Sequence, residues 1–211
     1  MLNLPGTAEV NSRIPKQKLY ENINLSPALK RVFVENIKAV YWRYKIAPST
    51  MNIEAGKNVT EIELFEIQLT DNSPIDGALQ QINKAIPYNN IFLLSFNGKY
   101  KACIIYKTAD GKLTKQINTD WLEYDNLPLQ VKGFNLDSVW ENFVFQISDL
   151  IPDATKTLDE ILTESDEQEK IQKEIDRLEK AARRESQPNK KLELHNKIKE
   201  LKKELNINSE T

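Results

Sequence analysis

Hydrophobic residues recur at three- and four-residue spacing in several segments of the chain, a pattern typical of amphipathic helices. The first such segment covers residues 26–46, with Ser26 as a cap and Pro27 in the first turn. The pattern predicts two further helices, over residues 74–86 and from about 137 to 152. We expect these helices to pack on a sheet.

Strands are predicted between these helices. Residues 51–54 and 60–69 resemble two strands joined by a glycine-containing connection, which fits a hairpin. A second hairpin turns at Asn97-Gly98, a pair typical of a type I′ turn, and a strand over residues 112–118 extends it into a meander. The sequence therefore predicts an α+β fold with a mixed or antiparallel sheet of five or six strands, packed by about three helices.

After Pro152 the composition changes, and from Ser165 the chain is mostly charged. The hydrophobic residues of this part form two sets with 4-3-4 spacing: Ile171, Ile175, Leu178 and Ala182, then Leu194, Ile198, Leu201 and Leu205. This spacing is typical of a coiled coil, and the short break at "SQPN" predicts an antiparallel helical hairpin. The predicted organisation is a globular α+β domain with an N-terminal arm (1–152), a linker (153–164), the hairpin (165–206) and a disordered tail (207–211).

Composition narrows the class of protein. A hydrophobic content of 40% with 28% charged residues is ordinary for a globular protein. No hydrophobic run approaches the ~20 residues of a membrane-spanning helix, and a signal peptide is not predicted. Cys103 is the only cysteine, so a disulfide within the chain is excluded and a reducing, cytoplasmic location is expected.

Few residues could support catalysis. His195 is the only histidine, which excludes a two-histidine metal site, a Ser-His-Asp triad and an HExxH motif within one chain. The sequence also contains no GxxxxGK or GxGxxG phosphate-binding loop. The remaining possibilities for this chain are catalysis by a metal ion bound to carboxylates, or no catalysis.

Several stretches, among them "RIPKQKLYE", "EIELFEIQL" and "INKAIPYNNIFLLSFNGKYKACIIYK", resemble a prokaryotic domain family of unknown function. The resemblance covers roughly Leu4 to Leu205. Members of that family tend to be encoded beside large helicases and DNA methyltransferases of restriction-like phage-defence loci. The resemblance implies an intracellular protein near DNA-processing machinery, and it carries no catalytic residue onto this chain.

One candidate site consists of Glu54, Glu66 and Gln68. Nucleases of the PD-(D/E)xK type use a helix, antiparallel strands, a helix and a further strand, with an acid on the second strand and an acid-x-lysine on the third. Two carboxylates could hold Mg²⁺, the cofactor of this alternative alone, and the metal would activate water. However, Glu replaces the usual Asp and Gln68 replaces the lysine. Carboxylates at the solvated margin of a sheet, or paired with lysine, are the favoured interpretation.

A second candidate is a weak nucleic-acid contact by basic residues. It comprises Arg13, Lys16 and Lys18 of the arm and Arg31, Lys38, Trp42 and Lys45 of the predicted helix 26–46. At ~100° per residue the last four lie within roughly 60° of each other on that helix. Glu35 in the same stripe and a net charge of −2 weaken attraction to DNA, so an ordinary solvated face is favoured.

The hairpin tip is the third candidate, because a projecting charged hairpin suits a protein contact. It gathers Arg183, Arg184, Lys190 and Lys191. The combined interpretation is a non-catalytic adaptor subunit of a prokaryotic DNA-associated defence complex, without a cofactor, that docks on a helicase or methyltransferase. The alternatives are a divergent Mg²⁺-dependent nuclease and a DNA-binding module.

Overall fold

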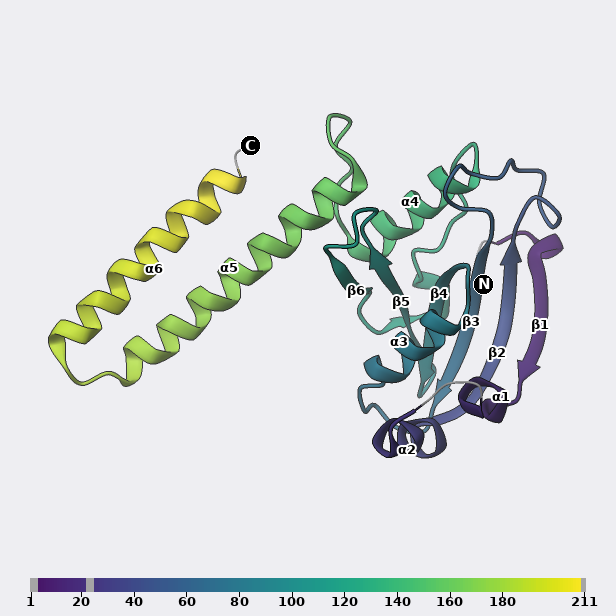
Figure 1. Ribbon diagram of the computed structural model, residues 1–211, viewed down its shortest axis with the longest axis horizontal. Helices are drawn as coiled ribbons and strands as arrows, with labels where there is room; N and C mark the ends of the chain where they lie inside the picture. Colours follow the sequence, from purple (N-terminus) through teal and green to yellow (C-terminus); the bar gives the residue numbers. More distant parts are fainter. Residues whose placement is uncertain (1–3, 22–24, 210–211) are drawn as a thin grey trace. The chain divides into compact units, whose positions relative to one another are not determined.

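A computed structural model describes residues 4–21 and 25–209 (Figure 1). The chain divides into two compact units, one ending at Ile151 and the other beginning at Pro152. Among the described residues, no helix combines the length and the apolar character needed to cross a membrane.

The first unit is built on one sheet. Its strands, in spatial order, are β1 (Glu9–Ile14), β2 (Ile37–Ile46), β3 (Ile62–Leu69), β4 (Asn89–Phe96), β5 (Lys99–Lys107) and β6 (Thr114–Asn118), and β7 (Leu122–Glu123) also pairs with β5. Its α-helices are α1 (Lys16–Glu21), α2 (Pro27–Glu35), α3 (Asp76–Ala85) and α4 (Leu136–Ser148), with short 3₁₀ turns at η1 (Gly6–Ala8) and η2 (Tyr124–Asn126).

Neighbouring strands are antiparallel except for β3 and β4, which are parallel. Two parallel neighbours need a crossover connection, and α3 supplies it. The predicted α+β class with a mixed sheet is therefore confirmed.

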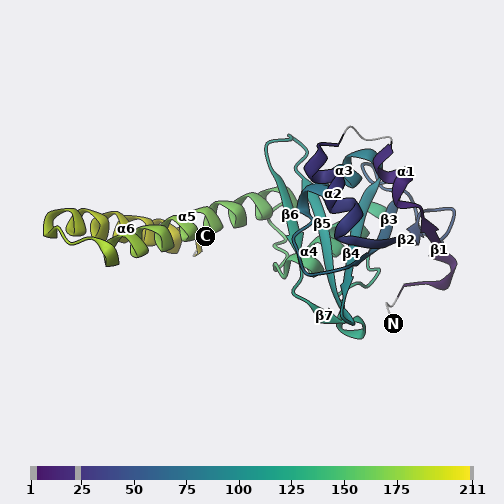
Figure 2. The ribbon, with the colours of Figure 1, turned by 90° about the horizontal axis from the view of Figure 1, so that it is seen from below.

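Side chains on β3 point alternately to the two faces of this sheet. Phe65 and Ile67 point to the face covered by α1, α2 and α3, which we call the α3 face. The opposite face of the sheet is the one on which α4 contacts β5 and β6, and we call it the α4 face (Figure 2). Leu64 and Glu66 point to this face. The buried cluster of the α3 face comprises Phe33, Ile37, Val40, Phe65, Ile67, Leu69, Ile75, Ala78, Leu79, Ile82, Phe92, Leu94 and Cys103.

The predicted helix over residues 26–46 is wrong in its second half. Ser26 caps α2 and Pro27 opens it as expected, but α2 ends at Glu35 and the chain continues as β2. The segment "IKAVYWRYKI" is rich in β-branched and aromatic residues, which suit a strand. Pairing with β1 and β3 satisfies its backbone, and this non-local pairing outweighs the helical spacing of its hydrophobic residues.

The predicted strand over residues 51–54, and its hairpin with residues 60–69, are also wrong. Within this segment only Glu54 forms a β-bridge, an isolated one with Asn135. The partner of β3 is β2, and residues 47–61 form the connection between these two strands.

The other elements of the first unit agree with the sequence. Asn97 and Gly98 adopt φ values of 47° and 77°, as the β4–β5 turn requires. β6 completes the predicted meander, and α3 and α4 occupy the predicted segments. Asn135 and Ser138 form a capping box at the start of α4.

The second unit is the predicted antiparallel hairpin of α5 (Leu158–Arg184) and α6 (Pro188–Ser209). α5 begins seven residues before the predicted start at Ser165, because Thr157 and Glu160 form its capping box. The first turns of α5 therefore lie in the segment predicted as a linker, 153–164. α6 runs into the predicted tail 207–211, of which residues 210 and 211 lie outside the described residues.

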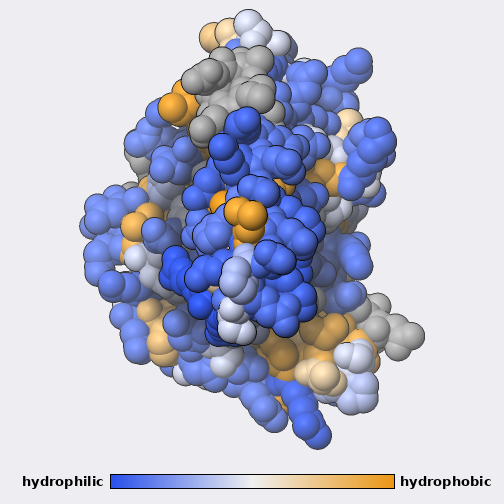
Figure 3. Space-filling view, turned by 90° about the vertical axis from the view of Figure 1, so that its left-hand side faces the viewer, coloured by the Kyte–Doolittle hydropathy of each residue, from blue (hydrophilic) through white to orange (hydrophobic). Residues whose placement is uncertain are grey.

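Both predicted hydrophobic sets meet in the hairpin. Ile175, Leu178, Ala182 and Ile198 are buried, and Ile171, Leu194, Leu201 and Leu205 pack against them. On the face of the molecule seen in Figure 3, hydrophilic residues predominate and hydrophobic residues form small separate patches.

Candidate functional site

Two β-bulges in β2 determine which face of the sheet two of its basic side chains occupy. β2 has one extra residue relative to β3 at each of two register shifts, and these extra residues are Lys38 and Arg43. A bulge turns a side chain away from the regular alternation of the strand. Both residues line hollows on the α4 face.

Arg43 makes an ion pair with Glu66 of β3. Its Nε and Nη2 atoms lie 2.7 and 2.6 Å from the same carboxylate oxygen. Its Nη1 atom donates to the side-chain oxygen of Asn11, which has a φ of 48° at a register shift in β1. The guanidinium also lies 4.6 Å from the ring centroid of Tyr41. Irregular backbone in two strands therefore brings Asn11 and Arg43 together.

Both carboxylate oxygens of Glu66 accept hydrogen bonds from other side chains. One oxygen receives Arg43, and the other accepts hydrogen bonds from Gln68 at 3.1 Å and Ser95 at 3.0 Å. Glu66 is only 5% exposed, so these donors stabilise its carboxylate in place of water. The resulting network joins β1, β2, β3 and β4.

Two adjoining hollows lie over this network and share Glu66 and Tyr100. The first also contains Lys38, Gln68 and Ser95. The second has a volume of about 560 Å³ and is lined by Glu9, Asn11, Arg43, Tyr44, Glu66, Leu93, Tyr100, Tyr124 and Asp125. We call the second one the tyrosine hollow.

The nuclease hypothesis required Glu54, Glu66 and Gln68 to act together. Glu66 and Gln68 are hydrogen-bonded to each other. Glu54 lies in the connection between β2 and β3, and its carbonyl accepts from the Leu136 amide at the start of α4. Over residues 4–21 and 25–209, no group of three or more His, Cys, Asp or Glu side chains could hold a metal ion. β2, the second antiparallel strand, carries Arg43 and no acid.

The predicted basic helix face does not exist, because Lys38, Trp42 and Lys45 belong to β2. Trp42 packs on the core of the α3 face, and its indole N–H donates to the Tyr44 carbonyl at 3.1 Å. Lys45 pairs with Glu61 at 2.6 Å. Arg31 alone of these four lies on α2, where it is exposed.

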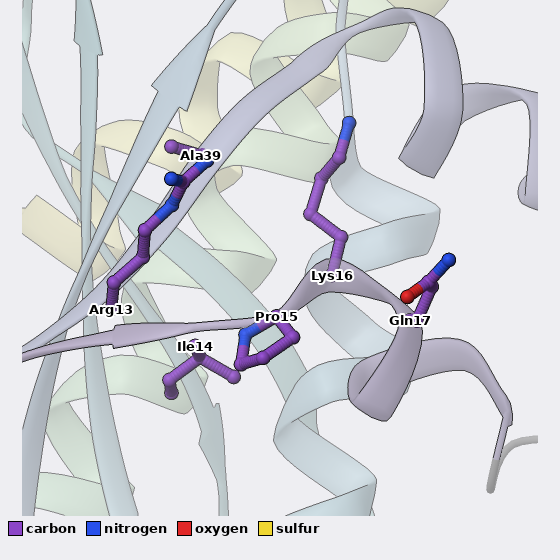
Figure 4. Close-up of a pocket in the computed structure, with 6 residues that line it drawn as sticks. All are labelled: Arg13, Ile14, Pro15, Lys16, Gln17 and Ala39. Carbon is purple, nitrogen blue, oxygen red and sulfur yellow. The ribbon is translucent and has the colours of Figure 1, made fainter.

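The arm residues lie around β1 and α1. Figure 4 shows a hollow where Arg13 extends toward Ala39 and Lys16 projects from the start of α1. The Lys16 ammonium donates to the carbonyl oxygens of Ile37 and of Val34, the latter at 3.3 Å. Lys16 thus binds one carbonyl at the end of α2 and one at the start of β2, and Lys18 lies on α1. Arg13 and Lys16 line this hollow, whereas Lys38 of β2 lines the hollow that contains Glu66 and Gln68.

Glu61 and Glu63 form a carboxyl pair beside Lys45. Burial, followed by the hydrogen bond and charge of Glu61, raises the pKa of Glu63 to about 8. Burial opposes ionisation of Glu61 too, but hydrogen bonds from Glu63 and Lys45 lower its pKa overall. Glu63 therefore holds a proton at neutral pH while Glu61 is ionised. Glu63 lies on β3 and Glu61 immediately precedes this strand, so the two acids are two residues apart and share a face.

The family model described as "Domain of unknown function (DUF4391)" matches residues 2–205 of the chain. The chain belongs to this family. The match confirms the predicted membership in a family of unknown function that covers nearly the whole chain. No curated protein and no solved structure matched the chain.

The tip of the hairpin in this DUF4391 domain presents the four predicted basic residues. Arg183, Arg184, Lys190 and Lys191 are all exposed, and Arg183 lies 3.7 Å from Glu179. His195 is exposed nearby. Cys103 is buried, and this burial raises the pKa of its thiol to about 12, so it remains an unreactive thiol.

The sequence alone does not point to the central residues of this network and of the tyrosine hollow in the DUF4391 domain. Asn11, Arg43, Tyr100 and Tyr124 come from four different elements, and none belongs to a motif. Arg43 was hidden because its segment was predicted as a helix. The one available signal was Glu66, a carboxylate within a hydrophobic strand, which required a buried partner.

Proposed function

We propose that this DUF4391 protein is a non-catalytic interaction subunit of a restriction-like phage-defence complex, and that it docks on a helicase or a DNA methyltransferase. The α5–α6 hairpin is the observation that carries this proposal. The choice of a helicase or methyltransferase as the partner rests on the family resemblance of the sequence.

The hairpin satisfies its own hydrophobic residues in the seam between α5 and α6. Its outer surface is largely charged, and exposed ion pairs such as Lys173–Glu169 and Arg177–Glu174 add little to stability. Folding therefore does not require this charged surface. A long helical pair with a basic tip suits contact with an acidic surface of a partner protein.

The hydrogen bonds that occupy both carboxylate oxygens of Glu66 also support a non-catalytic role. A metal ion at this carboxylate would compete with Arg43 for one oxygen and with Gln68 and Ser95 for the other. The Arg43 guanidinium takes the place that a second acid would need on β2.

A divergent Mg²⁺-dependent nuclease is the second candidate, favoured by one observation. β1, β2 and β3 are antiparallel, α3 crosses over, β4 is parallel to β3, and Glu66-Ile-Gln68 lies on the third strand. This order resembles that of PD-(D/E)xK nucleases, although fold analogy does not establish activity. DNA cleavage with Mg²⁺ or Mn²⁺ that is lost in Glu66→Ala would select this candidate.

Co-purification from the native locus tests the interaction proposal. We expect the full-length protein, expressed with all its neighbours, to recover a helicase or methyltransferase. The double charge reversal Arg184→Glu/Lys190→Glu at the tip should reduce recovery at least about tenfold, since one lost contact of 1.4 kcal/mol has that effect.

The matched control is Lys199→Glu/Lys203→Glu, which makes the same change of net charge on exposed residues of α6 away from the tip. This control should retain the partner. A protein that purifies alone, or equal losses in both double variants, would contradict the proposal.

A further inference from the structure

A hollow lies between α5 and α6 near the tip of the hairpin, and we call it the hairpin hollow. It has a volume of about 520 Å³, and its charged lining comes from both helices, with Glu179 and Arg183 from α5 and Lys191 and Lys202 from α6. Ile198, a buried residue of the seam, also lines it. The hollow therefore combines charged walls with an apolar floor.

Positive charge exceeds negative charge in the hairpin hollow. Its lining contains one carboxylate, that of Glu179, which lies 2.8 Å from the Lys202 ammonium and 3.7 Å from the Arg183 guanidinium. The hydrogen bond from Lys202 lowers the pKa of Glu179, so this carboxylate is ionised at neutral pH. Lys191 adds a third positive charge. One carboxylate cannot balance three cations, so the hollow attracts anions.

The excess of positive charge extends over the tip half of the hairpin, residues 177–203, which we call the basic half. It contains ten Lys and Arg and four Asp and Glu. All ten basic residues are exposed. Arg177 pairs with Glu174, which lies outside the basic half. With Glu174 included, ten cations face five acids, and a net charge of +5 remains.

The acidic residues of α5 do not cancel this charge. They are concentrated in residues 158–176, which contain eight Asp and Glu and two Lys. Glu167, at the middle of that segment, lies roughly 24 Å from Arg183 along the helix. This separation is about three times the Debye length at physiological salt, so a ligand at the basic half experiences mainly the local positive charge. The net charge of −2 of the whole chain conceals this basic segment.

We propose that the basic half of the hairpin binds the phosphate backbone of nucleic acid, with one phosphate group held in the hairpin hollow. Contacts to phosphate require Lys and Arg side chains, and they release counterions from the nucleic acid. Seven of the ten cations are lysines, and residues 177–203 contain no Trp, Tyr or Phe. Protein interfaces are depleted of lysine and enriched in aromatic residues. This composition therefore favours a nucleic-acid backbone over an acidic protein surface.

Nucleic-acid binding goes beyond the function proposed above. That function assigns a protein contact to Arg184 and Lys190 at the tip, whereas the phosphate group contacts Arg183, Lys191 and Lys202 in the hollow. Binding of nucleic acid needs no partner protein. A measurement on the isolated full-length protein therefore tests this inference, and co-purification tests the other, so that either can fail alone.

Fluorescence anisotropy of a labelled DNA duplex of about 20 base pairs, two helical turns, measures the binding. We expect affinity to fall steeply with salt, with a slope of log K against log salt concentration of roughly −3 to −5. A single strand and a polyglutamate peptide of matching length are the comparison probes. Tighter binding of the duplex or of the single strand identifies the form of nucleic acid, and either result supports the proposal.

Arg183→Gln/Lys191→Gln removes two cations of the hollow. It should weaken duplex binding at least about tenfold and reduce the magnitude of the salt slope by about 1–2. The matched control is Lys170→Gln/Lys173→Gln, which removes two exposed cations from the acidic part of α5 and should leave both quantities nearly unchanged.

Circular dichroism checks that the hairpin stays helical in both double variants, and the salt slope of the wild type provides the test if it does not. Three results would overturn the proposal. They are the absence of duplex binding at about 50 mM salt with roughly 100 µM protein, equal effects of the two folded double variants, and polyglutamate binding as tight as that of DNA. A wild-type affinity for DNA that does not change with salt would contradict it as well.

Discussion

Glu63 is a carboxyl group that the fold keeps protonated. It is 4% exposed, and its Oε2 atom has no hydrogen-bond partner among the described residues. Its register neighbour on β4, Asn90, is 2% exposed and has a side-chain oxygen that is likewise without a described partner. An ionised Glu63 would place a second negative charge beside Glu61 in a poorly solvated position, which raises its pKa.

This raised pKa makes stability depend on pH. The native value of about 8 lies above the ordinary 4.5, so the native state binds this proton more tightly than the unfolded chain. The stability due to Glu63 is full below the ordinary value and is lost as pH rises through about 8. Glu63→Gln keeps the size and stays neutral. Its advantage over the wild type in free energy of unfolding should grow by roughly 2–4 kcal/mol between about pH 5 and pH 9.

Urea unfolding of both proteins at several pH values measures this difference. Glu61→Gln provides a contrast, because the lowered pKa of Glu61 contributes stability that is present above its unfolded pKa and is lost in acid. Parallel pH profiles for Glu63→Gln and the wild type would show that Glu63 is not protonated in the native state.

The connection between β2 and β3 is held by one side chain of α4. The Asp137 carboxylate accepts hydrogen bonds from the backbone amides of Lys57, Asn58 and Val59, at 2.7, 3.0 and 2.8 Å. Gly56 allows this approach, since a Cβ atom there would lie 2.2 Å from the carboxylate. Asp137 also lies in the first turn of α4, where negative charge is favourable.

Asp137→Asn should loosen this connection, because the neutral amide accepts fewer and weaker hydrogen bonds. We expect a loss of about 1–3 kcal/mol in the free energy of unfolding. Hydrogen exchange at the amides of Lys57, Asn58 and Val59 should accelerate, while that of the β4–β5 hairpin stays unchanged. The control is Asp153→Asn, whose carboxylate accepts from Thr155 only two residues away. Unchanged exchange at Lys57 to Val59 would mean that other contacts hold the connection.

The two units of the molecule can be followed separately by spectroscopy. All three tryptophans, Trp42, Trp121 and Trp140, belong to the first unit. The second unit is helical and contains none, so its unfolding is visible chiefly in circular dichroism. Ile198 is its most informative core residue, because it is the buried residue that α6 contributes to the seam.

Ile198→Ala should destabilise the hairpin by about 2–5 kcal/mol, the usual range for truncating a buried isoleucine. We expect the helical signal to melt at a lower temperature and the tryptophan fluorescence transition to stay in place. Lys199→Ala, a neighbouring exposed change, should move neither transition. A shift of both transitions in Ile198→Ala would show that the two units unfold together.

Local signals correctly predicted several elements. α3 and α4 follow from hydrophobic periodicity, the β4–β5 turn from Asn97-Gly98, and the hairpin from two matching 4-3-4 sets. In each case the residues that decide the structure are close together in the sequence. The sequence alone also shows that the chain has one histidine, one cysteine and no glycine-rich phosphate-binding motif. These facts exclude several classes of catalytic site before the fold is known.

Long-range pairing decided the remainder. The segment 37–46 has hydrophobic spacing that fits a helix, and it is a strand because β1 and β3 lie on either side of it. The bulges that turn Lys38 and Arg43 to the α4 face exist only relative to β3, so no sequence signal marks them. Glu66 was recognisable as an unusual carboxylate, but its pairing with Arg43 and the adjoining tyrosine hollow arise from residues that only the folded sheet brings together.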